Sequence, residues 1–294
     1  AGDLRLPVHP EGSADADRFA ARLSGADGRT PREVLSAALA RAADAGGALA
    51  DLAGRGLVTD GELDPGPTAA LRTLVAGPLS AVLDVSVTRR EGELRLRSWF
   101  GGTLAQIAQL STADGQRYEL AWFPPGLWAT QVTRAVTVEP WGRQRAPLAT
   151  YVSLPSELLA AATKTYRERR TDLLPALVEA QVGVVRAGGP GQVRVVDADG
   201  VLAVLRVLGA ECRGRLRLAL ARRTDDARVE PPALAAWLLF DDGWHELRPG
   251  RDATTVLRRR DTGDLGRLSR PWVHRLLAPP PADEPQATTD GASR

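Results

Sequence analysis

The chain has 294 residues, and its 38 basic side chains nearly balance 36 acidic ones, which gives a formal net charge of +2. This balance argues against a protein that follows a nucleic-acid backbone, because such proteins carry a clear excess or a one-sided cluster of basic residues. The single cysteine, Cys212, excludes an internal disulfide and a cysteine-based zinc cluster.

In the first half of the chain the apolar pattern changes from helical to strand-like. Residues 1–29 have few apolar positions, which predicts a weakly ordered N-terminal segment. Thr30-Pro31-Arg32-Glu33 has the composition of a capped helix start, and helical spacing continues to Gly54. From Leu83 onward apolar and polar residues alternate, as in strands. The further predicted elements are a helix at 67–76, strands from 83 and at 93–100, 103–110 and 116–123 with turns at Glu91-Gly92, Gly101-Gly102 and Asp114-Gly115, and a helix at 127–136.

The second half repeats this order of helices followed by strands. Two helices are predicted at 154–169 and 172–186, and the glycine-rich stretch 188–191 is predicted to be a loop. The strands predicted after it lie at 192–197, 201–208, 213–222, 234–240, 244–248 and 253–259, and a last helix lies at 263–277. Residues 278–294, with four prolines among small polar residues, are predicted to be a disordered tail.

Hairpin-length turns join most of the predicted strands, and strand-helix-strand crossovers are absent from the pattern. The chain is therefore predicted to be an α+β protein with a mainly antiparallel central sheet. We expect a first half at 30–150 and a second half at 151–277 that together form one domain, and the repeated order hints at an internal duplication.

The stretch "RGRLRLALARR" at 213–223 places arginines and leucines on alternate positions. Arg213, Arg215 and Arg217 are predicted to lie on the solvated face of one strand, with the intervening leucines in the core. Arg95 and Arg97 follow the same pattern in an earlier strand. Only one of the basic residues is a lysine, Lys164, which indicates a G+C-rich genome and makes the abundance of arginine weak evidence for function.

The residues that could carry catalysis are few and scattered. The histidines, at 9, 245 and 274, lie too far apart in sequence for a typical metal site. His245 near Asp241 and Asp242 could act as a general base, but these aspartates are also typical turn residues. Cys212 beside Glu211 has no recognisable histidine partner, and Asp197 and Asp199 form a carboxylate pair typical of a turn. Neither a catalytic set, a metal site nor a cofactor is predicted.

Two tryptophans belong to a dense aromatic segment, "WFPPGLW" at 122–128. Trp122 and Trp128 are candidates either for core packing or for a surface that anchors a protein partner, as aromatic residues often do. The longest apolar run, near 201–210, is interrupted by Arg206 and is shorter than the roughly 18 residues of a membrane span. The N-terminus has no charged-then-apolar leader, so a cytosolic protein without membrane insertion is expected.

Several segments together resemble the EspG family of ESX (type VII) secretion-associated proteins of actinobacteria. The likeness extends over residues 30–277 and rests on the order of elements and on local patterns. The segments that carry it are "LAGRGLVTDGELDPGPTAALRTLVAGP" at 52–78, "LDVSVTRREGELRLRSWFGG" at 83–102, "AGGPGQVRVV" at 187–196, "DGWHELRP" at 242–249 and the helix after Asp261-Thr262.

The resemblance implies a central antiparallel sheet flanked by two helical bundles in a pseudo-twofold arrangement. It also implies a cytosolic chaperone without enzyme activity that holds a PE/PPE-like secretion substrate in solution. The sequence departs from the family pattern at Val193, where an aromatic residue is expected, and at the short turn Gly101-Gly102. The binding surface is predicted to include the five arginines at 95, 97, 213, 215 and 217 with Trp122 and Trp128.

Two other functions remain open from the sequence. The arginine-bearing strands could bind single-stranded nucleic acid on a sheet face, although the balanced charge argues against this. An enzyme whose site is assembled from residues distant in sequence is the second alternative.

Overall fold

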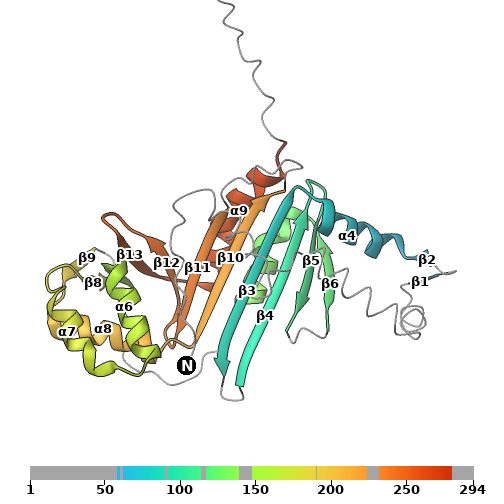
Figure 1. Cartoon of the computed structure of the whole chain (residues 1–294). Helices are drawn as coiled ribbons and strands as arrows, with labels where there is room; N and C mark the ends of the chain where they lie inside the picture. The colour runs from blue at the N-terminus through green and yellow to red at the C-terminus, as the bar shows by residue number, and fades with distance from the viewer. Residues whose placement is uncertain are drawn as a thin grey trace, which may run out of the picture.

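The computed structural model describes residues 58–59, 62–89, 92–113, 117–138, 148–189, 191–223 and 232–279. They form an α+β fold around one antiparallel sheet of eleven strands, which confirms the predicted fold class (Figure 1). The strand order across the sheet is β6-β5-β4-β3-β10-β11-β12-β13-β7-β8-β9, and a separate pair, β1 and β2, precedes it in the chain. The helix predicted from Thr30 to Gly54 and the predicted tail at 278–294 lie almost entirely outside the described residues.

The elements of the first half follow the predicted order closely. Their bounds are β1 (Val58–Thr59), β2 (Glu62–Leu63), α4 (Pro65–Ala76), β3 (Leu79–Arg89), β4 (Gly92–Gly102), β5 (Ile107–Thr112), β6 (Glu119–Phe123), the 3-10 turn η1 (Pro125–Leu127) and α5 (Trp128–Val136). Helix α4 starts at Asp64, whose carboxylate accepts a hydrogen bond from the Gly66 N–H at 2.8 Å, and two prolines occupy its first turn.

The second half contains the outer strands of the other end of the sheet. Its elements are β7 (Tyr151–Pro155), α6 (Ser156–Arg167), the 3-10 turn η2 (Thr171–Leu173), α7 (Leu174–Glu179), β8 (Arg186–Gly189), β9 (Gln192–Val195), α8 (Ala198–Ala210), β10 (Gly214–Arg222), β11 (Ala233–Phe240), β12 (Gly243–Pro249), β13 (Thr254–Arg260) and α9 (Thr262–Leu277). Strand β7 was not predicted, and helix α7 ends well before the predicted limit of 186.

The same order of elements occurs twice around the centre of the sheet. The run α4-β3-β4-β5-β6-α5 is matched by α8-β10-β11-β12-β13-α9. Strands β3 and β10 are antiparallel neighbours, from Leu79 opposite Arg222 to Val87 opposite Gly214. The two halves therefore meet at the middle of one sheet in the predicted pseudo-twofold arrangement.

The back face of the sheet, behind the plane of Figure 1, carries the largest core. The alternating leucines of β10, Leu216, Leu218 and Leu220, are buried there as predicted. Helices α5 and α9 cover this face and contact each other. Trp128 of α5 is fully buried, and its Nε1–H donates to Ser269 Oγ of α9 at 2.9 Å. This buried hydrogen bond ties the two helices together.

The front face of the sheet carries two smaller cores near its ends. Under α4, Leu74 packs with Trp99 and Leu110. At the other end, α6, α7 and α8 cover strands β7 and β13, where Val152 and Leu257 belong to a second cluster (Figure 1). Helical elements thus flank the front face at both ends and leave its central strands between them.

The prediction of a strand at 201–208 is wrong, because these residues belong to α8. A short run of branched apolar residues does not distinguish a buried strand from a buried helix. The helix is favoured by its start, where the Asp197 carboxylate accepts from the Gly200 N–H at 2.8 Å. Its buried residues then recur at helical spacing, at 201, 204, 205 and 208.

The predicted turn at Gly101-Gly102 is wrong, and the loop predicted at 188–191 is wrong at Gly188 and Gly189, because these glycines lie inside β4 and β8. At Gly101 and Gly188 the backbone of another element approaches closely. A Cβ atom on Gly101 of β4 would lie 2.4 Å from the Leu74 Cα of α4. A Cβ atom on Gly188 of β8 would lie 2.1 Å from the Gln192 carbonyl oxygen of β9. The turn between β4 and β5 is formed instead by residues 103–106. Glycine is required here for close packing.

Two adjacent arginines at the end of β10 cap helices on opposite faces of the sheet. Arg222 donates to the carbonyl oxygens of Arg275 at 2.7 Å and Ala278 at 2.8 Å, at the C-terminus of α9. Arg223 donates to carbonyl oxygens at the end of α4, including that of Val75. Cations at helix C-termini satisfy open carbonyls and the helix dipole.

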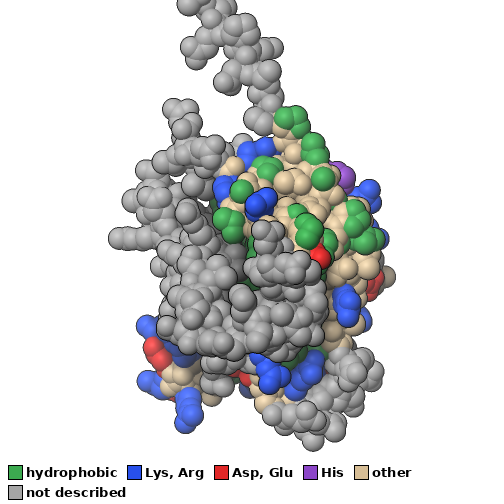
Figure 2. Space-filling model, turned by 90° about the vertical axis from the view of Figure 1, so that its right-hand side faces the viewer, with side chains coloured by type: hydrophobic (Ala, Val, Ile, Leu, Met, Phe, Trp, Pro, Cys, Tyr) green, Lys and Arg blue, Asp and Glu red, His purple; other side chains and the backbone are tan. Residues whose placement is uncertain are grey.

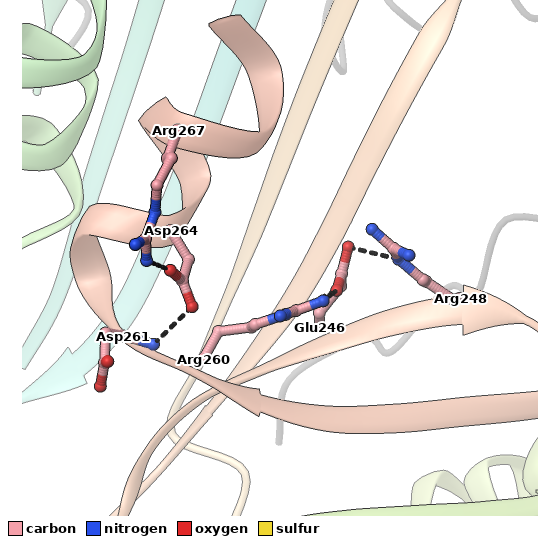
Figure 3. Close-up of polar contacts among 6 residues, drawn as sticks. All are labelled: Glu246, Arg248, Arg260, Asp261, Asp264 and Arg267. Carbon is pink, nitrogen blue, oxygen red and sulfur yellow. Dashed lines mark hydrogen bonds and ion pairs between the residues drawn. The ribbon is translucent and has the colours of Figure 1, made fainter. Parts of the chain in front are cut away.

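Helix α9 also begins with a well-defined cap. The backbone N–H of Asp261 donates to the Asp264 carboxylate at 3.2 Å, in the reciprocal arrangement of a capping box (Figure 3). Arg267 pairs with the same carboxylate one turn along the helix. No helix in the described part of the chain is both long and apolar enough to cross a membrane.

We predict that Gly266→Ala destabilises the protein through the contact between α5 and α9. A Cβ atom at Gly266 would lie 2.6 Å from the Ala129 Cα, so the helices would have to separate, at a cost of about 1–3 kcal/mol. Thermal and denaturant unfolding measure the difference. Gly263→Ala is the matched control, because nothing lies within 4 Å of a Cβ there. Equal stability of the two variants would contradict close packing at Gly266.

Candidate protein-binding surface

Four of the five predicted arginines lie together on the front face, in two rows across β4, β3 and β10. In one row Asp84 lies between Arg97 and Arg217, and in the next Ser86 lies between Arg95 and Arg215. We call these six residues the arginine strip. The Arg97 Nε donates to Asp84 Oδ1 at 2.6 Å, and its guanidinium lies 5.9 Å from the centre of the Trp99 ring.

The middle of the arginine strip is less exposed than its ends, because Asp84, Ser86 and Arg97 are partly buried. Arg95, Arg215 and Arg217 are exposed. Arg95 donates to Glu93 at 2.8 Å, and this hydrogen bond lowers the pKa of the Glu93 carboxyl. Each arginine presents a flat charged group on a long apolar stem, which suits a surface that contacts both carboxylates and apolar groups.

Arg213 lies apart from the strip. Its side chain is only 10% exposed, and its Nε lies 2.8 Å from Asp241 Oδ1 in the turn between β11 and β12. The prediction of a solvated arginine is wrong at this position. Strand β10 begins at Gly214, and Arg213, just before it, packs against the turn between β11 and β12. Sequence alternation alone does not show where a strand ends.

The two tryptophans predicted for the surface lie in different environments. Trp122 of β6 is exposed, on the front face near the start of α4. Trp128 is fully buried on the back face, where it packs edge-on against Phe100 with ring centres 5.0 Å apart. Trp128 is therefore a core residue and cannot anchor a partner without unfolding.

The end of the molecule formed by α4 and β6 carries scattered apolar residues. Figure 2 faces this side, and hydrophobic side chains form several separate patches in its upper part, with arginines among them. The exposed large apolar residues of the β4–β5 turn, β6 and η1 are Leu104, Trp122 and Leu127. Separate small patches are common on protein surfaces and do not by themselves mark a binding site.

The candidate general base His245 is withdrawn from solvent. It is fully buried on β12, its Nε2 lies 3.2 Å from both carboxylate oxygens of Asp242, and its ring packs edge-on against Phe240 at 5.3 Å. This arrangement fixes the hairpin turn and offers no access to a substrate. His9 lies outside the described residues, and His274 is exposed on α9.

The other candidate reactive groups also have structural roles. Cys212 is partly buried, and its Sγ–H donates to the Gly214 carbonyl at 3.4 Å. Burial raises the pKa of its thiol to about 11, so the thiol stays protonated at neutral pH. Asp197 caps α8, and Asp199 lies exposed in the first turn of that helix. Within the described ranges, His, Cys, Asp and Glu form no group of three that could bind a metal.

A buried carboxylate that sequence reasoning missed lies on the back face. Glu246 of β12 is 5% exposed and contacts Arg248 Nε at 2.6 Å and Arg260 Nε at 2.8 Å (Figure 3). Both arginines are close in the sheet, one two residues along β12 and one on the neighbouring β13. Two guanidinium groups on one carboxylate satisfy the buried charge of Glu246 and form a structural cluster.

A small pocket lies between β10 and α9. Its volume is about 80 Å³, and Leu220, Arg222, Trp272 and Leu276 are among its lining residues. Small-molecule sites are usually several times larger, roughly 300–1,000 Å³. This pocket is therefore too small to be a candidate for a typical small-molecule site.

We predict that the native protein alkylates slowly at Cys212. A pKa raised to about 11 leaves the native thiolate fraction at pH 8 about a hundredfold below that of an unfolded chain, whose cysteine has an ordinary pKa. The rate with iodoacetamide should therefore rise strongly in denaturant, and should keep rising with pH beyond 9 in the native state. A native rate equal to the unfolded rate would indicate an activated thiol.

No protein-family model matches the sequence, and no curated protein matches it. Among solved structures, the fold is similar to that of the type VII secretion system chaperone EspG5 of Mycobacterium tuberculosis, which was determined in complex with the PE25-PPE41 dimer. The TM-score is 0.53 at 14% sequence identity, over 80% of this chain and 86% of EspG5. At this identity the similarity shows an EspG-like fold.

Proposed function

We propose that this protein is a cytoplasmic secretion chaperone of the ESX (type VII) kind, which binds a helical PE/PPE-like substrate protein and keeps it soluble for export. The observation that carries the proposal is the fold shared with EspG5 over most of both chains. EspG5 is a chaperone, and its structure includes a bound PE25-PPE41 dimer. A holding chaperone performs no bond chemistry, which agrees with the structural roles of Cys212 and His245.

We place the substrate on the front face, at the arginine strip and the neighbouring strand β11. These strands lie between α4 at one end and helices α6 to α8 at the other, so a helical partner could rest on the sheet with helices beside it (Figure 1). Leu234 of β11 is exposed on this face, next to Ala219 of β10. The surface thus offers apolar contact beside guanidinium groups, as central parts of protein interfaces do.

Coexpression tests the proposal directly. The full chain, with an affinity tag, is produced together with PE/PPE-type pairs encoded in the genome that encodes it, and in parallel each pair is produced alone. We expect at least one pair to be soluble only in the presence of the chain and to elute with it as one complex. If no pair binds while labelled single-stranded DNA or RNA binds at physiological salt, the proposal is wrong.

We predict that Arg215→Glu combined with Arg217→Glu weakens substrate binding at least about tenfold, or about 1.4 kcal/mol. The two substitutions reverse the charge of exposed residues on the proposed surface. Titration calorimetry with the copurified substrate measures the change, and circular dichroism verifies the fold. Arg270→Glu is the matched control, because Arg270 is exposed on α9, which covers the opposite face of the sheet. Equal loss in both variants would place the substrate elsewhere.

A further inference from the structure

The two edges of the eleven-stranded sheet differ in how open they are. Strand β6 forms one edge, and three of its five residues are buried or partly buried. Strand β9 forms the other, and all four of its residues, Gln192 to Val195, are exposed. In the described part of the chain no strand pairs with the outer side of β9. An open edge presents backbone groups that can pair with another chain.

The backbone direction of β9 follows from its pairing with β8. The Val196 N–H donates to the Val185 carbonyl at 3.0 Å, so the backbone groups of Val196 point inward. In an antiparallel pair these groups point inward and outward at alternate residues. The N–H and C=O of Val193 and Val195 therefore point outward, where a further strand would pair with them.

The same two residues also expose apolar side chains. Val193 is 45% and Val195 is 49% exposed, and both side chains lie on the back face of the sheet. Val182 and Val184, in the turn before β8, are also exposed. The next residue, Val185, accepts a hydrogen bond from Val196, directly after β9. Apolar side chains and open backbone groups thus occur along one short edge.

Positive charge lies on both faces of this edge. Arg194 projects from β9 on the front face, and Arg186, opposite Val195 on β8, lies on the back face. Both arginines are exposed, and neither β8 nor β9 contains an acidic residue. The nearest acidic residues, Asp197 and Asp199, follow the end of β9 at the start of α8. Along β9 itself the two arginines are complementary to an acidic partner.

We infer that the outer edge of β9 binds an extended acidic polypeptide segment by strand addition. Residues of the segment on the back face would be apolar and cover Val193 and Val195, while an acidic residue on the front face would lie opposite Arg194. The recognised pattern is therefore alternating apolar and acidic. A polypeptide is favoured over a nucleic acid because only a peptide backbone can pair with the open groups of Val193 and Val195. This surface is separate from the arginine strip.

The probe for this site is a synthetic peptide of about eight residues in which valine and glutamate alternate, a length typical of a strand. We expect the full chain to bind it, measured by fluorescence polarisation of a labelled peptide. Two altered peptides test the mode of binding, one with lysine in place of glutamate and one with N-methylated valines. Each should bind at least about tenfold more weakly, the first through charge and the second through lost backbone hydrogen bonds.

Variants of the protein test the same edge. Val193→Thr combined with Val195→Thr keeps the charge and the β-branched shape and should weaken binding of the glutamate peptide at least about tenfold through lost apolar contact, and Arg194→Glu should reverse the preference toward the lysine peptide. Leu104→Thr, at an exposed position in the turn between β4 and β5, is the control and should bind normally. Undiminished binding of the N-methylated peptide, equal binding by Arg194→Glu, or binding of single-stranded DNA alone would overturn the inference. So would the absence of peptide binding.

Discussion

The pairing of β3 with β10 holds the two halves of the molecule in one sheet, and its register determines both faces. On the back, Val85 lies opposite Leu216 in the large core, and on the front Asp84 lies opposite Arg217 in the arginine strip. Because strand side chains alternate, a shift by one residue would move the arginines into the core and the leucines into solvent. The apolar core behind the sheet therefore fixes the position of the charged surface in front of it.

Strand β10 also locates helices on both sides of the sheet. Arg222, its last residue, caps α9 behind the sheet, and Arg223, which follows it, caps α4 in front. These two arginines belong to the same arginine-rich stretch as Arg215 and Arg217, yet they serve the fold and not the surface. Burial lowers the pKa of Arg223, and the carbonyl oxygens around it compensate the buried charge. A single stretch thus provides a strand, two helix caps and part of the proposed binding surface.

The sequence predicted those features that depend on local pattern. Period-two alternation located β3, β4 and β10 and assigned the leucines to the core, because each strand has one buried and one solvated face. The failures have a different origin. The roles of Gly101 and Gly188 depend on the backbone of another element, which the local sequence does not show. The α8 segment was predicted as a strand because its apolar run fits either a buried strand or a buried helix, and only tertiary packing decides between them. The arginines of the strip were predicted one by one and not as a group. Their arrangement in two rows depends on the register between β3, β4 and β10, which the sequence alone does not determine.

The reactive polar groups of this fold and its exposed side chains are of different kinds. The most reactive side chains are withdrawn from solvent or bound to fixed partners. They are the Cys212 thiol, the His245 imidazole and the Glu246 carboxylate. Exposed positions carry instead arginine and valine, which bind by charge, stacking and apolar contact. A broad sheet supports such contacts well, because neighbouring strands hold the side chains at fixed spacing and little ordering remains to be done on binding. The same eleven-stranded sheet therefore holds side chains in fixed positions on one face and open backbone groups in fixed positions at one edge.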